Sequence, residues 1–437
     1  MDHAWSHNGR FLVTFSKTPN PTASSGETMR QSRSDVQFTM EDTWTTVAKL
    51  FVGFQEVAEC MATRFDFGIS PTFVRRQAES ILDVLRAIPR SGSAAVPAGE
   101  VIQACLDDLR ELAPATYRKT LARIAGVSLI HAHFRSRMSD RGVAQAIAAS
   151  SLYEIVQDLL DDLLDGGGLT FVEARRLYEL CLRPLTHPAV SCDRLEDDLA
   201  DFMAPGQDRL AHVLASATSE LRGLLAGSDA HVLERVADGH EALTLAQAAT
   251  VHLRGEALDI PVMREIGGTL PTPDPSLSWL DRLAIYASWP SNIALFDAGF
   301  TSTPVSDPEL NAHARAWLFF DAAVTFLEHY AGAKKDSDEG IVNIARISIR
   351  PPEAGPDGHA FHGFSATERN SLFEKATSCL VRAIREGTAT GHDADDYVFM
   401  ALIIPTVIFA MARTPPAEAE EFLGGLAAAV RSEVHVS

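Results

Sequence analysis

Positive charge and paired cysteines are both scarce in this sequence. Its 437 residues include 38 Lys and Arg against 58 Asp and Glu, which gives a formal net charge of −20. A nucleic-acid interface needs a basic face, so this balance argues against nucleic acid as a partner. The five cysteines are scattered and form no CxxC pair. They indicate neither a disulfide framework nor a zinc site, and they favour a reducing cytoplasm.

Long apolar runs are also missing. The longest, YVFMALIIPTVIFAMA at 397–412, contains Pro405. It is short for a membrane span, so we expect a buried core helix with a kink at the proline. The first residues, MDHAWSHNGRFLVTF, lack the basic start and apolar stretch of a signal peptide. We therefore expect no integral membrane span and a cytoplasmic protein.

Nucleotide-binding and hydrolase motifs are absent too. The sequence has no GxxxxGK[ST], no GxGxxG after a strand, no GxSxG and no HExxH. The stretch DSDEG at 336–340 resembles the start of an EF-hand, but the twelfth position of that loop would be Ile347. A calcium loop requires a bidentate Glu there, so we reject calcium at this position.

Helical periodicity dominates the rest of the chain. Residues 17–37 are polar and rich in Ser, Thr and Pro, so we expect 1–39 to be a disordered tail and 40–437 to be one helical domain. Strand signals are confined to RFLVTF near the start and IVNIARISI at 341–349, which do not make a sheet domain. The fold class that we expect is all-α. The expected helices are 41–65, 71–88, 98–111, 115–138, 142–165, 170–183, 193–203, 207–226, 239–256, 277–297, 307–333, 365–387, 395–413 and 416–432.

A row of carboxylates follows one face of the helix expected at 142–165. We call these five side chains the acid stripe: Glu154, Asp158, Asp161, Asp162 and Asp165. Like charges three and four residues apart disfavour a helix, and the glycines at 166–168 end it where the macrodipole disfavours anions. No Lys or Arg occurs between Arg141 and Arg175. The local sequence thus lacks a positive partner, and a metal ion is the simplest candidate.

The end of the acid stripe has the pattern D-D-x-x-D. Asp161, Asp162 and Asp165 place carboxylates on successive turns toward one volume. Mg²⁺ is a hard ion that is held by one or two carboxylates, waters and substrate phosphates. In an all-α protein this pattern is how class I isoprenoid synthases bind Mg²⁺ and ionise a prenyl diphosphate.

A known family resembles this chain in two places. DLLDDLLDGGG followed by ARRLYELCLRPL resembles the first motif of the bacterial tetraprenyl-β-curcumene synthase family, which are class I terpene synthases. LEHYAGAKKDSDEGIVNI at 327–344 resembles the second motif, an H-Y followed by acids and G-x-x-N. The residues that match this second motif in type are His329, Tyr330, Asp336, Asp338, Gly340 and Asn343. The chain departs from the family directly after the H-Y, where Ala331, Gly332 and Ala333 stand in place of an acid.

The resemblance implies roles for several residues. Asp158, Asp161, Asp162 and Asp165 would bind Mg²⁺, and the last three would be the catalytic acids. Arg175, one helix further on, would bind the diphosphate, and Asp336 would belong to a second metal site. The fold implied is one large helical domain of isoprenoid-synthase type with a central active-site cavity.

A different second metal site can be built from the residues themselves. Asp321 and Thr325 lie four residues apart on the helix expected from 307, and Glu328 follows one residue before the position where an acid is usual. The alternative is a solvated helix face.

The most basic segment of the chain lies at 118–137. Its charged residues could meet a diphosphate or pair with surface acids; they are Arg118, Lys119, Arg123, Arg135 and Arg137.

Together these features predict a Mg²⁺-dependent terpene synthase, a carbon–oxygen lyase that ionises a prenyl diphosphate and cyclises the carbocation. We expect an apolar, aromatic cavity, because aromatic faces stabilise cations without supplying a nucleophile. A chain-elongating prenyltransferase is one alternative, although a second equally strong aspartate-rich motif is lacking. A non-catalytic helical interaction protein that presents the acid stripe to a partner is the other.

Overall fold

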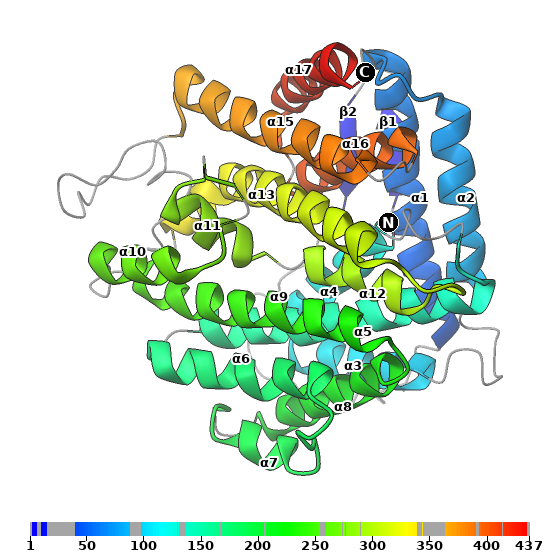
Figure 1. Ribbon diagram of the computed structural model, residues 1–437. Coiled ribbons are helices and arrows are strands. Elements are labelled where there is room, and N and C mark those ends of the chain that lie inside the picture. Colours follow the sequence, from blue (N-terminus) through cyan, green and yellow to red (C-terminus); the bar gives the residue numbers. More distant parts are fainter. Residues whose placement is uncertain are drawn as a thin grey trace, which may run out of the picture.

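The computed structural model covers most of the chain. It describes residues 2–6, 10–14, 40–87, 98–128, 130, 137–166, 168–204, 207–253, 259–272, 274–275, 277–288, 290–338, 343, 363–389, 393–412 and 414–434. The described part is all-helical from residue 40 onward (Figure 1). The prediction of an all-α protein is therefore confirmed.

The described residues up to Ala249 contain nine α-helices. They are α1 (Met40–Phe65), α2 (Pro71–Ala87), α3 (Ala98–Leu112), α4 (Pro114–Val127), α5 (Asp140–Asp165), α6 (Phe171–Thr186), α7 (Leu195–Ala200), α8 (Asp208–Leu225) and α9 (Ala230–Ala249). A short 3₁₀ helix, η3 (Thr250–Leu253), follows α9. The remaining helices are α10 (Ile260–Thr269), α11 (Trp279–Tyr286), α12 (Pro290–Gly299), α13 (Asp307–Asp338), α15 (Ala366–Thr388), α16 (Ala394–Ala412) and α17 (Pro416–Glu433).

Two short strands precede the helices. β1 (Asp2–Ser6) and β2 (Arg10–Thr14) pair as an antiparallel hairpin in which His3 lies opposite Val13. β2 coincides with the alternating RFLVTF pattern. The first helix begins at Met40, at the boundary predicted for the helical domain.

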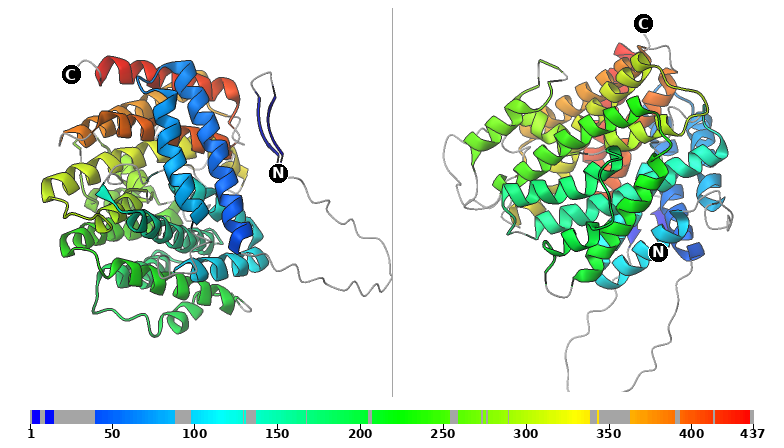
Figure 2. Two further views of the ribbon diagram at one scale, coloured as in Figure 1. Left: turned by 90° about the vertical axis from the view of Figure 1, so that its right-hand side faces the viewer. Right: turned by 60° about the horizontal axis from the view of Figure 1, so that its bottom comes forward.

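The helices pack in crossing layers around α5 and α13. α5 contacts α4, α8 and α12, and most of its side chains are buried, including an Ala-rich first half that lets its neighbours approach closely. α13 contacts α11 and α12 as well as α15 and α16 (Figure 1). α1 and α2 run along one side of the bundle, where α1 meets α16 and the C-terminal helix α17 (Figure 2).

Several helix boundaries differ from those expected. The helix expected at 115–138 ends at Val127, and the one expected at 277–297 is divided into α11 and α12. Pro290 opens α12, because proline disfavours helical backbone before it and has no N–H to continue a helix. α9 begins earlier than residue 239, and α10 was not expected. The strand signal at 341–349 lies outside the described residues apart from Asn343.

The longest apolar run forms a buried helix, as expected. It makes up most of α16, where residues such as Val398, Phe399 and Leu402 are fully buried. Thr406 follows Pro405 and donates its hydroxyl to the Leu402 carbonyl at 2.7 Å. Among the described helices, none has the length and apolar character that crossing a bilayer requires.

Candidate functional site

The acid stripe faces two cations on α4. The Lys119 ammonium lies 3.1 Å from Asp158 Oδ1, 3.5 Å from Asp161 Oδ2 and 3.9 Å from Asp162 Oδ1. The Arg123 guanidinium lies 3.0 Å from Asp158 Oδ1, 3.8 Å from Asp161 Oδ2 and 3.9 Å from Glu154 Oε2. The cation that the local sequence lacks therefore comes from a helix more than thirty residues away in the chain. The acid stripe therefore does not need a metal ion to balance its charge, and the lack of nearby Lys or Arg in the sequence no longer argues for one.

One face of α4 matches the acid stripe residue by residue. Thr116, Lys119, Thr120 and Arg123 share this face because they lie three and four residues apart. Thr116 donates to Asp162, and Thr120 donates to Asp158 Oδ2 at 2.6 Å. Positions that advance along α4 meet positions that go backward along α5, so the two helices run antiparallel.

The side chains of the acid stripe become more buried from Asp165, at the end of α5, back toward Asp158 and Glu154. The Glu154 and Asp158 side chains are only 1% and 0% exposed, whereas Asp161 is 17% and Asp162 42% exposed. Asp165 is exposed. The inner acids are thus held between helices, and the outer ones can reach solvent or a ligand.

Burial and neighbouring charges act differently on the pKa values of Asp161 and Arg123. Burial raises the pKa of Asp161 to about 6, although Lys119 and Arg123 oppose the rise. Burial also works against the charge of Arg123, but Asp158 and Glu154 outweigh it and raise the guanidinium pKa above its usual value. Tyr178 of α6 donates its hydroxyl to Asp161 Oδ1 at 3.1 Å. The arginine is permanently charged, and Asp161 titrates closer to neutrality than an ordinary aspartate.

A cavity of about 460 Å³ lies beside the inner end of the acid stripe. Its wall comes from α4, α5, α13, α16 and the end of α11. Most of the lining is apolar: Val127, Ile130, Ala284, Val324, Met400, Ile403, Ile404, Val407 and Ile408. The polar lining residues are Arg123, Glu154, Ser288, Thr325, Glu328 and His329.

The charged lining residues gather on one side of the cavity. Arg123 and Glu154 form an ion pair there, and Glu328 is close enough to help raise the pKa of Arg123. The expectation of an aromatic lining is wrong for the described residues, because no Phe, Tyr or Trp lines this cavity. Several phenylalanines of the described residues pack elsewhere in the core, as in the cluster of Phe373, Phe409 and Phe422.

The residues expected on α13 have separate surroundings. Asp321 is fully buried, and both of its carboxylate oxygens accept the Ser291 N–H at 3.1 Å, in the first turn of α12. Burial raises its pKa well above the usual value. Thr325 lines the cavity and donates to the Ala284 carbonyl at 3.0 Å, and Glu328 lines the same cavity. The fold thus brings Thr325 and Glu328 opposite the acid stripe, while Asp321 caps a neighbouring helix.

Three residues of the second resembling motif come together. Asn343 donates its side-chain amide to Asp336 Oδ2 at 2.6 Å and to the His329 carbonyl at 2.8 Å. His329 Nδ1 lies 4.0 Å from Asp336 Oδ2, and burial lowers the pKa of His329 to about 4. Asp338 instead pairs with Lys334, and Gly340 lies outside the described residues.

Arg175 forms an ion pair within its own helix, α6. Its Nε pairs with Glu179 Oε1 at 2.7 Å, and both residues line a pocket of about 390 Å³ between α6 and α9. Arg183 and Asp238 line the same pocket, and no member of the acid stripe does. The structure therefore gives no support to the diphosphate-binding role expected for Arg175.

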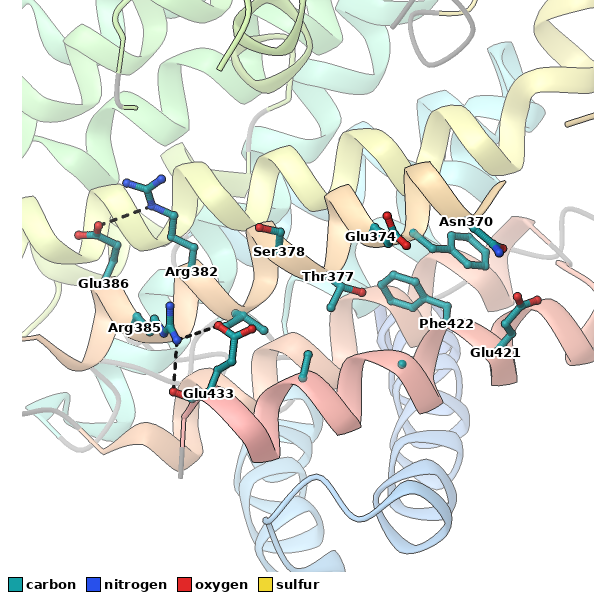
Figure 3. A pocket seen from close by; sticks show the side chains of 14 residues that line it. Asn370, Glu374, Thr377, Ser378, Arg382, Arg385, Glu386, Glu421, Phe422 and Glu433 are labelled. Carbon is teal, nitrogen blue, oxygen red and sulfur yellow. Dashed lines mark hydrogen bonds and ion pairs between the residues drawn. The ribbon is translucent and has the colours of Figure 1, made fainter. Parts of the chain in front are cut away.

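A third pocket, of about 620 Å³, lies between α15 and α17 (Figure 3). Arg385 pairs with Glu433 at 2.7 Å, and Arg382 with Glu386 at 3.9 Å. Its lining includes two arginines and four glutamates, and none of the expected site residues lines it. We therefore centre the candidate site on the acid stripe and its adjoining cavity.

The donor chemistry of the acid stripe fits a hard divalent cation. The described residues contain no preformed metal-ligand group of three His, Cys, Asp or Glu. Nevertheless, oxygens of Asp158, Asp161 and Asp162 converge on the Lys119 ammonium, which stands in as the bound cation. Carboxylate oxygens are the ligands that Mg²⁺ prefers. The outer acids Asp161 and Asp162 fit that ion best, because Asp158 is fully buried between Arg123 and Thr120.

Lys119 and Arg123 were recognised in the sequence as basic residues, but not as the partners of the acid stripe. The sequence signal for this role was the polar face of their helix, on which Thr116, Lys119, Thr120 and Arg123 recur at intervals of three and four residues.

Neither a scan of protein-family models nor a search of curated proteins finds a match to this chain. The terpene synthase resemblance thus remains a prediction.

Proposed function

We propose that this protein is a class I terpene synthase that acts on a prenyl diphosphate and depends on Mg²⁺. The observation that carries the proposal is the cavity, with an apolar body and with charged groups from α4, α5 and α13 gathered on one side. This division suits a substrate with a hydrocarbon chain and an anionic end that binds through a cation, since Glu154 and Glu328 outnumber Arg123 among the charged lining residues. Small-molecule sites are typically apolar cavities with a few convergent polar groups.

Some residues of the site would bind the substrate and the metal ion, and others would exclude water. Arg123 lines the cavity and also contacts the acid stripe, so its fixed positive charge can meet an anionic leaving group. Asp161, Asp162 and Asp165 would hold Mg²⁺. When bound, the ion supplies Lewis-acid stabilisation of the departing diphosphate. The aliphatic wall, including Ile403, excludes water and offers no nucleophile to a carbocation.

A chain-elongating prenyltransferase is the second candidate. The aliphatic lining favours it to the same degree, because such a surface holds an extended prenyl chain but lacks the aromatic faces that guide cyclisation. A surface role for the whole acid stripe has less support, since Glu154 and Asp158 are buried beneath α4.

The experiment is incubation of the protein with prenyl diphosphates of graded length, with and without Mg²⁺, followed by analysis of diphosphate and hydrocarbon products. Cyclic or linear hydrocarbons from one substrate support the synthase, and longer prenyl diphosphates from two substrates support the transferase. The Asp162→Ala variant should lose Mg²⁺-dependent diphosphate release. Its melting temperature should change little, because removing a carboxylate relieves repulsion from the neighbouring acids but also removes the Thr116 hydrogen bond and the Lys119 ion pair.

Asp197→Ala on α7 is the matched control, because Asp197 is an exposed helical aspartate outside the site. It should keep full turnover. If Asp162→Ala also keeps full turnover, the acid stripe has no catalytic role.

A further inference from the structure

Two cations serve the acid stripe, and they are not equivalent. The Arg123 side chain is 20% exposed and pairs with the inner acids Glu154 and Asp158. The Lys119 side chain is 32% exposed, and among the ion pairs of the described residues it alone reaches Asp162. Lys119 is therefore the outer cation, located where the acids become accessible.

The chemistry of Lys119 makes it a substitute for a small bound cation. An ammonium is a compact point charge with three donors, whereas a guanidinium is a planar fork. The Lys119 Nζ meets oxygens from Asp158, Asp161 and Asp162 at 3.1, 3.5 and 3.9 Å. A divalent ion on the oxygens of Asp161 and Asp162 would thus lie against an ammonium, and two positive charges at such separations repel strongly.

The ammonium is also on a flexible stem of four carbons, and it is more exposed than the Arg123 guanidinium, which pairs with the buried acids Glu154 and Asp158. An anion at the charged side of the cavity would offer the ammonium a new partner. Its departure would leave Asp162 without a cation among the described residues and Asp161 with Arg123 alone, at 3.8 Å, which frees oxygens of the two outer acids for a hard divalent ion.

We propose that Lys119 is a built-in competitor of the divalent ion. Its ammonium occupies the carboxylate site in the free protein, and the ion enters only together with a diphosphate group that draws the ammonium away. Metal and diphosphate then bind as a pair, and neither binds well alone. The identity of the two ligands rests on the proposed function, whereas the competitor role rests on the observed contacts of Lys119.

The first test uses the unmodified protein and no substrate turnover. Melting temperature is measured with MgCl₂ alone, with inorganic pyrophosphate alone, and with both, since a ligand that binds the folded state raises it. Only the combination should produce a clear rise. A saturable rise with MgCl₂ alone, equal to that with both ligands, overturns the proposal, and so does no response to any of the three.

The second test removes the competitor. Lys119→Gln should melt lower than the unmodified protein without metal, and should respond to MgCl₂ alone at a half-maximal concentration lower by about tenfold or more. Lys119→Arg keeps the positive charge, so it should respond to MgCl₂ alone no better than the unmodified protein does. Lys375→Gln is the matched control, because Lys375 forms a comparable ion pair with Asp281 at 3.5 Å. It should gain no response to Mg²⁺.

The outcomes separate the two proposals. If Lys119→Gln gains Mg²⁺ binding but the unmodified protein consumes no prenyl diphosphate, the competitor role of Lys119 is supported and the synthase function is excluded. If the unmodified protein turns over a prenyl diphosphate, but it and Lys119→Gln bind Mg²⁺ equally well, the competitor role of Lys119 is excluded and the synthase function is retained. Should Lys119→Gln fail to fold, the first test decides alone.

Discussion

Asp161 lies at the boundary between the buried and the accessible parts of the acid stripe. It accepts a hydrogen bond from Tyr178 and lies within 4 Å of both Lys119 and Arg123. Even so, burial dominates and raises its pKa from 3.8 to about 6. A single carboxyl can therefore link the stability of this site to pH.

The direction of that link follows from the proton affinities. Because folded Asp161 binds a proton more tightly than the unfolded chain does, its contribution to stability is complete below about pH 3.8 and is lost as pH rises through about 6. Asp161→Asn should thus be more stable than the unmodified protein at pH 8, by up to about 3 kcal/mol at 1.36 kcal/mol per pKa unit. The gain should shrink toward zero near pH 4.

Urea unfolding of both proteins between pH 4 and pH 8 measures this difference. Asp197→Asn supplies the control for an exposed aspartate, and its difference from the unmodified protein should be small throughout. A pH-independent gain for Asp161→Asn would contradict the raised pKa.

At the scale of the helix, α12 depends on a side chain from α13. Pro290 opens α12 without an N–H, and the next N–H, that of Ser291, is bonded by the Asp321 carboxylate. The first N–H groups of a helix have no partner within it, so an acceptor from elsewhere stabilises that end. Asp321 therefore fixes where α12 begins against α13.

This arrangement gives a test that separates capping from metal binding. Asp321→Asn keeps an oxygen acceptor and should change the free energy of unfolding by less than about 1 kcal/mol, whereas Asp321→Ala leaves the buried N–H of Ser291 unpaired and should cost about 1–3 kcal/mol. Chemical denaturation of the two variants measures the difference. If Asp321 instead holds Mg²⁺, Asp321→Asn should lose metal-dependent turnover as fully as Asp321→Ala.

Across the whole molecule, the cavity next to the acid stripe is where five helices fail to fill the space between them. Val407 of α16 lines it opposite Gly126 of α4, and a side chain built at Gly126 would meet Val407 Cγ1 at 3.3 Å. The absence of a side chain at Gly126 thus keeps part of this volume open.

Filling the cavity tests whether it is open in solution. Val407→Phe should leave the melting temperature unchanged or raise it, because added apolar volume fills empty space instead of overpacking a core. It should also shift prenyl diphosphate turnover toward shorter chains. Val172→Phe is the matched control, since Val172 of α6 is 72% exposed. Destabilisation by about 1–3 kcal/mol for Val407→Phe would show that this wall is already packed.

The sequence by itself determined most of the helical segments and where several of them begin. The helix expected from residue 365 is α15, and at its start the Ser365 hydroxyl accepts the Glu368 N–H while Glu368 bonds back to Ser365. The helix expected from residue 307 begins there, at Asp307 of α13. These signals are local, since caps, prolines and periodicity act over a few residues, and the packing of neighbouring helices does not change them.

Only the tertiary structure decided what the acid stripe faces. Periodicity placed its five carboxylates on one face of α5, but periodicity says nothing about which face of which distant helix covers them. Lys119 and Arg123 precede Asp158 by 39 and 35 residues, and they reach it because α4 and α5 pack antiparallel. Ion pairing depends on distances of a few ångströms, so a charge that appears unbalanced along the chain can be neutralised across it.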